Sequence, residues 1–161
     1  MPDIKVKLFK EVLNTPLIPA SGVFGYGDEY DFIQKDYIGA FVTKGLSLEP
    51  KEGNPTPRIA ETEGGIMNSV GLQNIGIKKF INEKLPEIKK LKTKIIVNFF
   101  GNTEEEYIKI AEILDSEKNI FALEMNVSCP NVKTGGLAFG QDAKLIEHLT
   151  KSIKKTTRRV F

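Results

Sequence analysis

The sequence predicts an α/β fold with a parallel sheet, specifically the first four βα units of a (β/α)8 TIM barrel. Two observations carry this prediction: short apolar runs alternate with segments of helical periodicity, and each apolar run ends on small or polar residues. A barrel carries its functional groups at the carboxyl ends of its strands. The polar residues at the ends of the apolar runs therefore favour a barrel over a doubly wound sheet. No G-x-G-x-x-G motif follows the first run, which argues further against a dinucleotide-binding sheet.

Four apolar runs have the length of buried strands in a parallel sheet. They occupy residues 17–20, 39–43, 95–97 and 121–125. The residues that follow them are Ser21, Lys44, Asn98 and Asn126. Because these strand ends would meet at one edge of the barrel, they are candidate site positions. Ahead of the first run, residues 4–13 fit a small hairpin.

The segments between the runs have helical patterns. We predict helices over residues 28–35, 75–91, 103–116 and 143–155. Pro86 is expected to kink or split the second of them, because proline lacks the amide hydrogen that a helix needs. Asn102 is expected to cap the third, whose first turn carries three glutamates that the helix dipole favours.

Composition excludes several classes of protein. The 161 residues suffice for one domain, and a net charge of +2 gives no basic surface for nucleic acid or membrane. No apolar run approaches the ~20 residues of a membrane span, and the N-terminus lacks a signal peptide, so we expect a cytoplasmic protein. One cysteine forms no internal disulfide, and no metal site is expected. His148 falls on a helix and needs no functional role.

The densest chemical signal is the segment Asn126 to Val132, in which a strand end runs into a loop with two amides, a hydroxyl and the only thiol. A lone cysteine is more often a small buried hydrophobe. Cys129, however, follows a strand end and lies between Asn126 and Asn131 in sequence, where a substrate would bind. This position favours a chemical role for Cys129.

Three further segments are candidates. Residues 64–74 are expected to form one short loop that offers side-chain amides and glycine-exposed backbone N–H groups. Such groups suit a planar ligand rich in carbonyls and ring N–H groups, although an ordinary polar turn fits equally well. Lys44 can hold an anion or the electron-rich edge of a flavin; its alternative is a surface lysine. Prolines stiffen residues 49–58, which we interpret as a wall or lid of the site. Arg58 is expected to have a structural role.

Together these segments resemble the class 1 dihydroorotate dehydrogenases of pyrimidine synthesis, from about Leu17 to Thr156. The motifs that carry the resemblance are Ala20-Ser21-Gly22, Thr43-Lys44-Gly45, Asn68-Ser69-Val70-Gly71-Leu72 and Asn126 through Val132. The continuation from Lys133 to Gly140 is similar to the B-type branch. That branch implies FMN on this chain, a partner subunit with FAD and a [2Fe–2S] cluster, NAD⁺ as final acceptor, and a homodimer of FMN subunits within a heterotetramer.

The resemblance also implies a role for each candidate residue. Cys129 is expected to remove the proton from C5 of dihydroorotate while a hydride passes from C6 to N5 of FMN, giving orotate. The expected substrate contacts are Lys44, Asn68, Ser69, Val70, Gly71, Leu72, Asn126 and Asn131. The expected flavin contacts are Ser21, Lys44, Gly45, Asn98 and Asn126.

The length of the chain departs from the family pattern. A barrel takes about 250 residues, and the 161 residues here supply four units. We therefore interpret residues 1–161 as the N-terminal half of one FMN-binding barrel domain, cut before the fifth strand and inactive alone, without the family's FMN phosphate grip. The alternatives are a related pyrimidine-reducing flavoprotein and a non-catalytic half-barrel.

Overall fold

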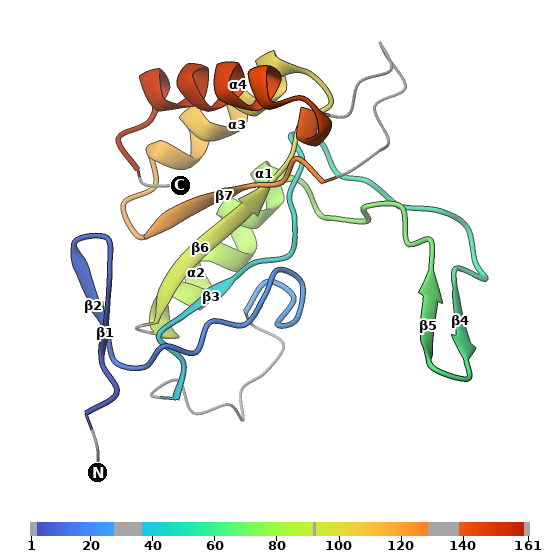
Figure 1. The fold of residues 1–161 in the computed structure, drawn as a ribbon, viewed down its shortest axis with the longest axis horizontal. Helices are drawn as coiled ribbons and strands as arrows, with labels where there is room; N and C mark the ends of the chain where they lie inside the picture. The colour runs from blue at the N-terminus through green and yellow to red at the C-terminus, as the bar shows by residue number, and fades with distance from the viewer. Residues whose placement is uncertain (1–2, 28–36, 92, 129–138, 160–161) are drawn as a thin grey trace.

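A three-stranded parallel sheet lies at the centre of the fold (Figure 1). The computed structural model describes residues 3–27, 37–91, 93–128 and 139–159. The sheet has the order β3 (Ala40–Val42), β6 (Lys94–Phe99) and β7 (Ala122–Met125). Val42 pairs with Ile96, and Asn98 pairs with Glu124. Three of the four predicted strands are therefore confirmed, and the fold is α/β.

The prediction of a strand at residues 17–20 is wrong. The segment lies beside β3, where the Leu17 carbonyl accepts from Gly39 N at 2.9 Å and the Pro19 carbonyl accepts from Val42 N at 3.3 Å. Pro19 has no amide hydrogen to donate in return, so a regular ladder does not form. Leu17 is also 60% exposed, which is unlike the buried strand expected from its apolar sequence.

The two faces of the sheet have different partners. Ile95, Val97 and Phe99 alternate along β6 and pack into the main core against the helices. Ile96 points to the other face, where it joins a smaller cluster with Ala40, Val42, Ala122 and Leu13. Leu13 comes from the hairpin of β1 (Val6–Leu8) and β2 (Glu11–Leu13), which confirms the hairpin predicted at residues 4–13.

The predicted helix 75–91 is split, as expected from Pro86. It forms α1 (Ile77–Lys79), the π-helical η2 (Phe80–Lys84), α2 (Leu85–Ile88) and the 3₁₀ turn η3 (Lys89–Leu91). Pro86 lies in the first turn of α2, where its missing amide hydrogen is tolerated. In the wide turn before it, Leu85 N donates to the carbonyl of Phe80, and both side chains are buried. The predicted helix 28–35 lies outside the described residues.

The other two helices form one layer over the sheet: α3 (Glu104–Asp115) and α4 (Ala143–Thr156), the latter preceded by η4 (Phe139–Gln141). Thr103 caps α3, because its hydroxyl accepts from Glu106 N. The prediction of Asn102 as the cap is therefore wrong. Asn102 instead donates its backbone N–H and its amide to the Glu106 carboxylate, at 2.7 and 2.8 Å.

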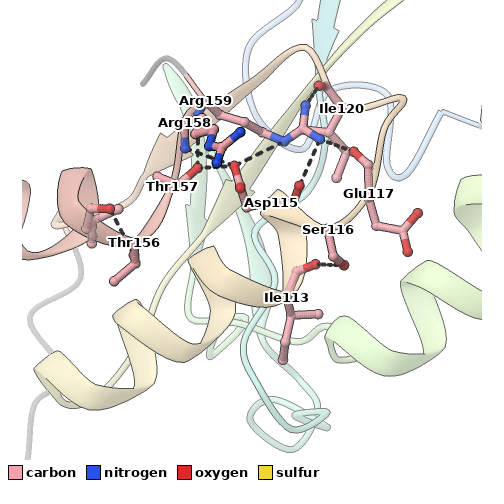
Figure 2. A network of polar contacts seen from close by, with 10 residues as sticks. Ile113, Asp115, Ser116, Glu117, Ile120, Thr156, Thr157, Arg158 and Arg159 are labelled. Carbon is pink, nitrogen blue, oxygen red and sulfur yellow. Dashed lines mark hydrogen bonds and ion pairs between the residues drawn. The ribbon is translucent and has the colours of Figure 1, made fainter.

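The end of α4 is tied to the end of α3 by a polar network (Figure 2). The Asp115 carboxylate accepts from Thr157 Oγ1 at 2.5 Å and from Arg158 N at 3.1 Å. Burial acts to raise the pKa of Asp115, but the hydrogen bonds from Thr157 and Arg158 and the nearby Arg159 charge outweigh it, so this pKa is lowered. The Arg159 guanidinium donates to the carbonyl of Asp115, in the last turn of α3, and to the carbonyls of Glu117 and Ile120 in the segment that follows.

A second hairpin was not predicted. It consists of β4 (Ile59–Thr62) and β5 (Gly65–Asn68), which pair antiparallel with Ala60 opposite Met67. Every residue of both strands is exposed, and Figure 1 shows the hairpin standing apart from the central sheet. The prediction of one short loop over residues 64–74 is therefore wrong, since β5 occupies its first part.

Candidate functional site

The polar ends of β3 and β6 are joined at one edge of the sheet. Thr43 N donates to the Ile96 carbonyl at 3.0 Å, and Asn98 N donates to Thr43 Oγ1 at 3.2 Å. Ser21 Oγ donates to the Thr43 carbonyl at 3.0 Å. Lys44 N donates to the Gly25 carbonyl at 2.7 Å. The structure thus brings together four predicted site residues: Ser21, Lys44, Gly45 and Asn98.

Asn98 is the most informative of them. The residue is 4% exposed, and its Nδ2 donates to Glu124 Oε1 at 2.6 Å. Its Oδ1 is buried without a hydrogen-bond partner among the described residues. A Cβ on Gly45 would lie 2.8 Å from this oxygen, so the glycine keeps the space beside it open. A buried acceptor of this kind is costly unless a donor from outside the chain, a ligand or a water molecule, bonds to it.

Asn126 follows β7 and is held by its backbone. Its N–H donates to the Phe99 carbonyl at 2.8 Å, and its own carbonyl accepts from Tyr107 Oη at 2.6 Å. Its side-chain Oδ1 accepts from Ser128 N at 3.0 Å, so the amide nitrogen is the end that can donate to a ligand. Cys129 and Asn131 lie outside the described residues.

The predicted substrate segment, residues 68–72, is held by the loop before it. Ser69 N donates to the Arg58 carbonyl at 2.9 Å, and Asn54 donates to the Ser69 and Val70 carbonyls at 2.7 and 3.0 Å. Asn68 ends β5 and is exposed; Figure 1 shows that strand apart from the ends of β3 and β6. Gly71, at φ 76°, lies so close to Asn54 that a Cβ would be 2.8 Å away, so loop packing explains this glycine.

Arg58 has the structural role expected of it. Its guanidinium donates to the Asn54 carbonyl at 3.1 Å and to Gln73 Oε1 at 2.6 Å, which links the two ends of the loop that carries the hairpin. Lys51 and Asn74 add two backbone hydrogen bonds of 2.9 Å across the same loop. Residues 49–58 therefore support residues 68–74.

Asn74, which the sequence offered as a ligand-binding amide, is used internally. It is 5% exposed. Its Oδ1 accepts from Ser47 N at 3.1 Å and from Gly76 N at 2.9 Å, and its Nδ2 donates to Ser47 Oγ at 2.8 Å and to the Leu72 carbonyl at 3.0 Å. Because both ends of the amide are satisfied, Asn74 stabilises the loop and has no free capacity for a ligand.

Lys44 lines a cavity of about 1060 Å³, together with Tyr26 and Gln73. The cavity continues between the loop at residues 48–52 and residues 75–79 and 81–83, which lead into and form the first helical turns. Asn98 and Asn126 are not among the residues that line it. Among the described residues, the cavity therefore reaches the candidate site only at Lys44, and the rest of it lies beside α1 and η2.

Glu124 contacts the candidate site residue Asn98 and was not among the predicted site residues, because it falls within a predicted strand. Strand periodicity gives the available signal, since Glu124 follows Ala122 at the spacing that places both on one face.

In the described parts of the chain, no cluster of three His, Cys, Asp or Glu could hold a metal ion. Nor does any described helix have the length and apolarity to cross a bilayer.

Comparison with known proteins agrees with this arrangement. A model of the family "Dihydroorotate dehydrogenase" matches residues 3–161. The catalytic subunit of dihydroorotate dehydrogenase B (NAD(+)) from Geobacter sulfurreducens is 50% identical over 157 residues, covering 97% of this chain and 52% of the relative. The same subunit from Pelobacter propionicus is 50% identical over 159 residues, covering 98% of this chain and 52% of that one.

A solved structure has the same fold. Dihydroorotate dehydrogenase from Eimeria tenella, in complex with ferulenol, superposes with a TM-score of 0.68 at 18% identity, over 97% of this chain and 44% of that chain. The chain spans about half the length of the curated relatives it matches. From the family match over nearly its whole length, the chain belongs to the dihydroorotate dehydrogenase family.

Proposed function

We propose that residues 1–161 form part of the FMN-binding catalytic subunit of an NAD⁺-linked dihydroorotate dehydrogenase, which oxidises dihydroorotate to orotate within a closed (β/α)8 barrel. The observation that carries the proposal is the unpartnered Oδ1 of buried Asn98, beside Gly45, at the edge where Ser21 and Lys44 also lie. The sequence identity of about 50% to B-type catalytic subunits supports the same function.

The residues present fit FMN. The oxidised isoalloxazine ring is planar and carries one imide N–H between two carbonyls. Asn98 Oδ1 is an acceptor without a donor, and the absent side chain at Gly45 leaves room for a flat ring to approach it. The Lys44 ammonium and the Asn126 amide nitrogen are donors for the ring's oxygens and nitrogens. When bound at this site, FMN would serve as the hydride acceptor.

The proton chemistry is assigned to Cys129, three residues after Asn126 in sequence. A thiol that ionises to the thiolate is able to abstract a carbon-bound proton next to a carbonyl, provided that the substrate is held against it. We assign the holding of the pyrimidine ring to Lys44, Asn126 and Asn131 and to residues 68–72. These assignments rest on the residue types and on the family's motifs.

The partner is inferred from the relatives. The two Geobacter and Pelobacter proteins are named catalytic subunits of an NAD(+)-type enzyme, and that name implies a second subunit. We propose that this partner carries FAD and a [2Fe–2S] cluster and passes electrons to NAD⁺ in the cytoplasm. The FMN subunits themselves are proposed to form a homodimer within a heterotetramer.

The test uses the complete catalytic subunit that contains residues 1–161. The purified protein should be yellow from bound FMN, and it should convert dihydroorotate to orotate in the presence of an artificial electron acceptor. Dihydrouracil serves as the control substrate and should react far more slowly. A colourless protein, or one that prefers dihydrouracil, would overturn the proposed function.

A further inference from the structure

We propose that Glu124 is a positioning residue: it fixes the orientation of the Asn98 amide so that Oδ1 is presented to the imide N–H of the flavin. This inference rests on the proposed function, because it takes FMN as the ligand at this edge of the sheet. The ligand chemistry it requires is an imide N–H group, which is present in both FMN and orotate, and we assign the contact to FMN.

The two side chains are neighbours by sheet register. Asn98 on β6 pairs with Glu124 on the parallel strand β7, so their side chains project from the same face. Asn98 Nδ2 and Glu124 Oε1 are 2.6 Å apart, a short hydrogen bond of the kind that a charged acceptor makes.

The remaining freedom of Asn98 is rotation of its amide. Its backbone N–H is bound to Thr43 Oγ1 at 3.2 Å, and its carbonyl accepts from Leu46 N at 3.1 Å, so the backbone is fixed on both sides. A half-turn of the amide exchanges the positions of Oδ1 and Nδ2, which differ in shape very little. An ionised carboxylate only accepts hydrogen bonds, so Glu124 admits the orientation with Nδ2 toward it and disfavours the other.

The consequence appears on the far side of the amide. With Nδ2 toward Glu124, the acceptor Oδ1 faces the space beside Gly45. The reversed amide would present a donor there, which would oppose an imide N–H. Asn74 provides the contrast within this chain, since hydrogen bonds satisfy both ends of its amide and leave nothing for a ligand.

The experiment compares three variants of the complete subunit with the wild type. Glu124→Gln keeps the shape but is able to donate as well as accept, so the Asn98 amide is free to turn. The double variant Glu124→Gln with Asn98→Asp reverses the donor and acceptor of the pair while keeping an acceptor toward the flavin. Glu112→Gln changes an exposed glutamate on α3 and is the matched control.

Two readouts are independent of turnover. The first is FMN affinity, from the quenching of flavin fluorescence; loss of one net hydrogen bond of about 1 kcal/mol predicts ~5-fold weaker binding in Glu124→Gln. The second is the N3–H resonance of FMN labelled with nitrogen-15, which should move toward its position in free FMN. The double variant should recover part of the FMN affinity and part of the resonance shift. Glu112→Gln should leave both readouts at their wild-type values. The temperature of thermal unfolding should be the same for all the flavin-free proteins.

The outcomes separate the two proposals. If the wild type binds FMN and turns over dihydroorotate, but Glu124→Gln leaves both FMN affinity and the N3–H signal unchanged, the role of Glu124 is wrong and the proposed function stands. If Glu124→Gln instead weakens only orotate, in a titration with FMN bound, the assignment to the flavin is overturned. A wild type that binds no FMN overturns both.

Discussion

A Cβ on Gly45 would lie 2.8 Å from Oδ1 of Asn98, closer than a carbon atom and a carbonyl oxygen tolerate. Gly45→Ala should therefore displace the amide or fill the space beside it, and FMN affinity of the complete subunit should fall by ~10-fold or more, on the scale of one buried hydrogen bond with its partner left unpaired. Fluorescence titration measures the loss. Gly64→Ala is the control, because a Cβ there meets nothing within 4 Å; equal affinity in the two variants would contradict the site.

Cys129→Ala should lower dihydroorotate turnover by the ~10²–10⁴-fold that accompanies loss of a general base, while FMN stays bound. Steady-state kinetics with the flavin spectrum recorded on the same sample tests this. Cys129→Ser should keep a little activity that rises at higher pH, since a hydroxyl is a much weaker acid than a thiol. Near-normal turnover in Cys129→Ala would remove the thiol from the mechanism.

Lys44→Ala and Asn68→Ala should each weaken orotate binding, and Lys44→Ala should also shift the flavin's visible spectrum, because one ammonium is proposed to contact both ligands. Orotate titration followed by that spectrum measures both effects. Asn54→Ala is the informative comparison for Asn68, since Asn54 holds the neighbouring backbone of Ser69 and Val70 without being a proposed ligand contact. Unchanged orotate affinity in Lys44→Ala and Asn68→Ala would count against the site as drawn.

Residues 1–161 expressed alone should bind FMN weakly or not at all and should not oxidise dihydroorotate. The chain spans about half the length of its relatives, and the resemblance places the grip on the FMN phosphate beyond these residues. The open edges of the sheet also favour self-association. Size-exclusion chromatography with flavin absorbance decides the matter: a monodisperse, yellow and active 161-residue protein would require a second flavin anchor within the chain.

Asp115→Asn should destabilise the protein at neutral pH and have less effect in acid. The folded-state pKa of Asp115 is lowered below 3.8, so the ionised carboxylate stabilises the fold above that value, and this contribution is lost as pH falls through the folded pKa. Thermal unfolding of the complete subunit at pH 7 and in steps below pH 4 tests the sign, with Glu112→Gln as control. A stability difference that stays constant or grows in acid would contradict the network in Figure 2.

The central strands could be predicted because burial on both faces leaves an apolar run that the sequence displays directly, as in Ala40–Val42. The error at residues 17–20 came from the same rule: the run is apolar, but Pro19 prevents a ladder and no described element covers Leu17. The hairpin Ile59–Asn68 was missed because all its residues are exposed, so it lacks the alternation of a half-buried strand.

The candidate site was likewise predictable only in part. Residue type and position after an apolar run indicated Ser21, Lys44 and Asn98, which the fold places at one edge of the sheet, although the run before Ser21 is not a strand. Residue type could not separate Asn74 from Asn98, because the difference lies in which hydrogen bonds each amide already makes. Glu124 stayed hidden since its contact depends on the register between two strands that lie far apart in sequence.

The wide turn at Phe80–Lys84 affects how this chain should be compared with others. A π turn bonds residue i to i+5 and so holds one residue more than an α-helical turn. A homologue with a regular helix at this point would differ from this chain by a single-residue gap inside the helix. Structural alignments should therefore be anchored on Phe80 and Leu85, which the turn brings together. Deletion of one residue between them is the length change that this helix should accommodate best.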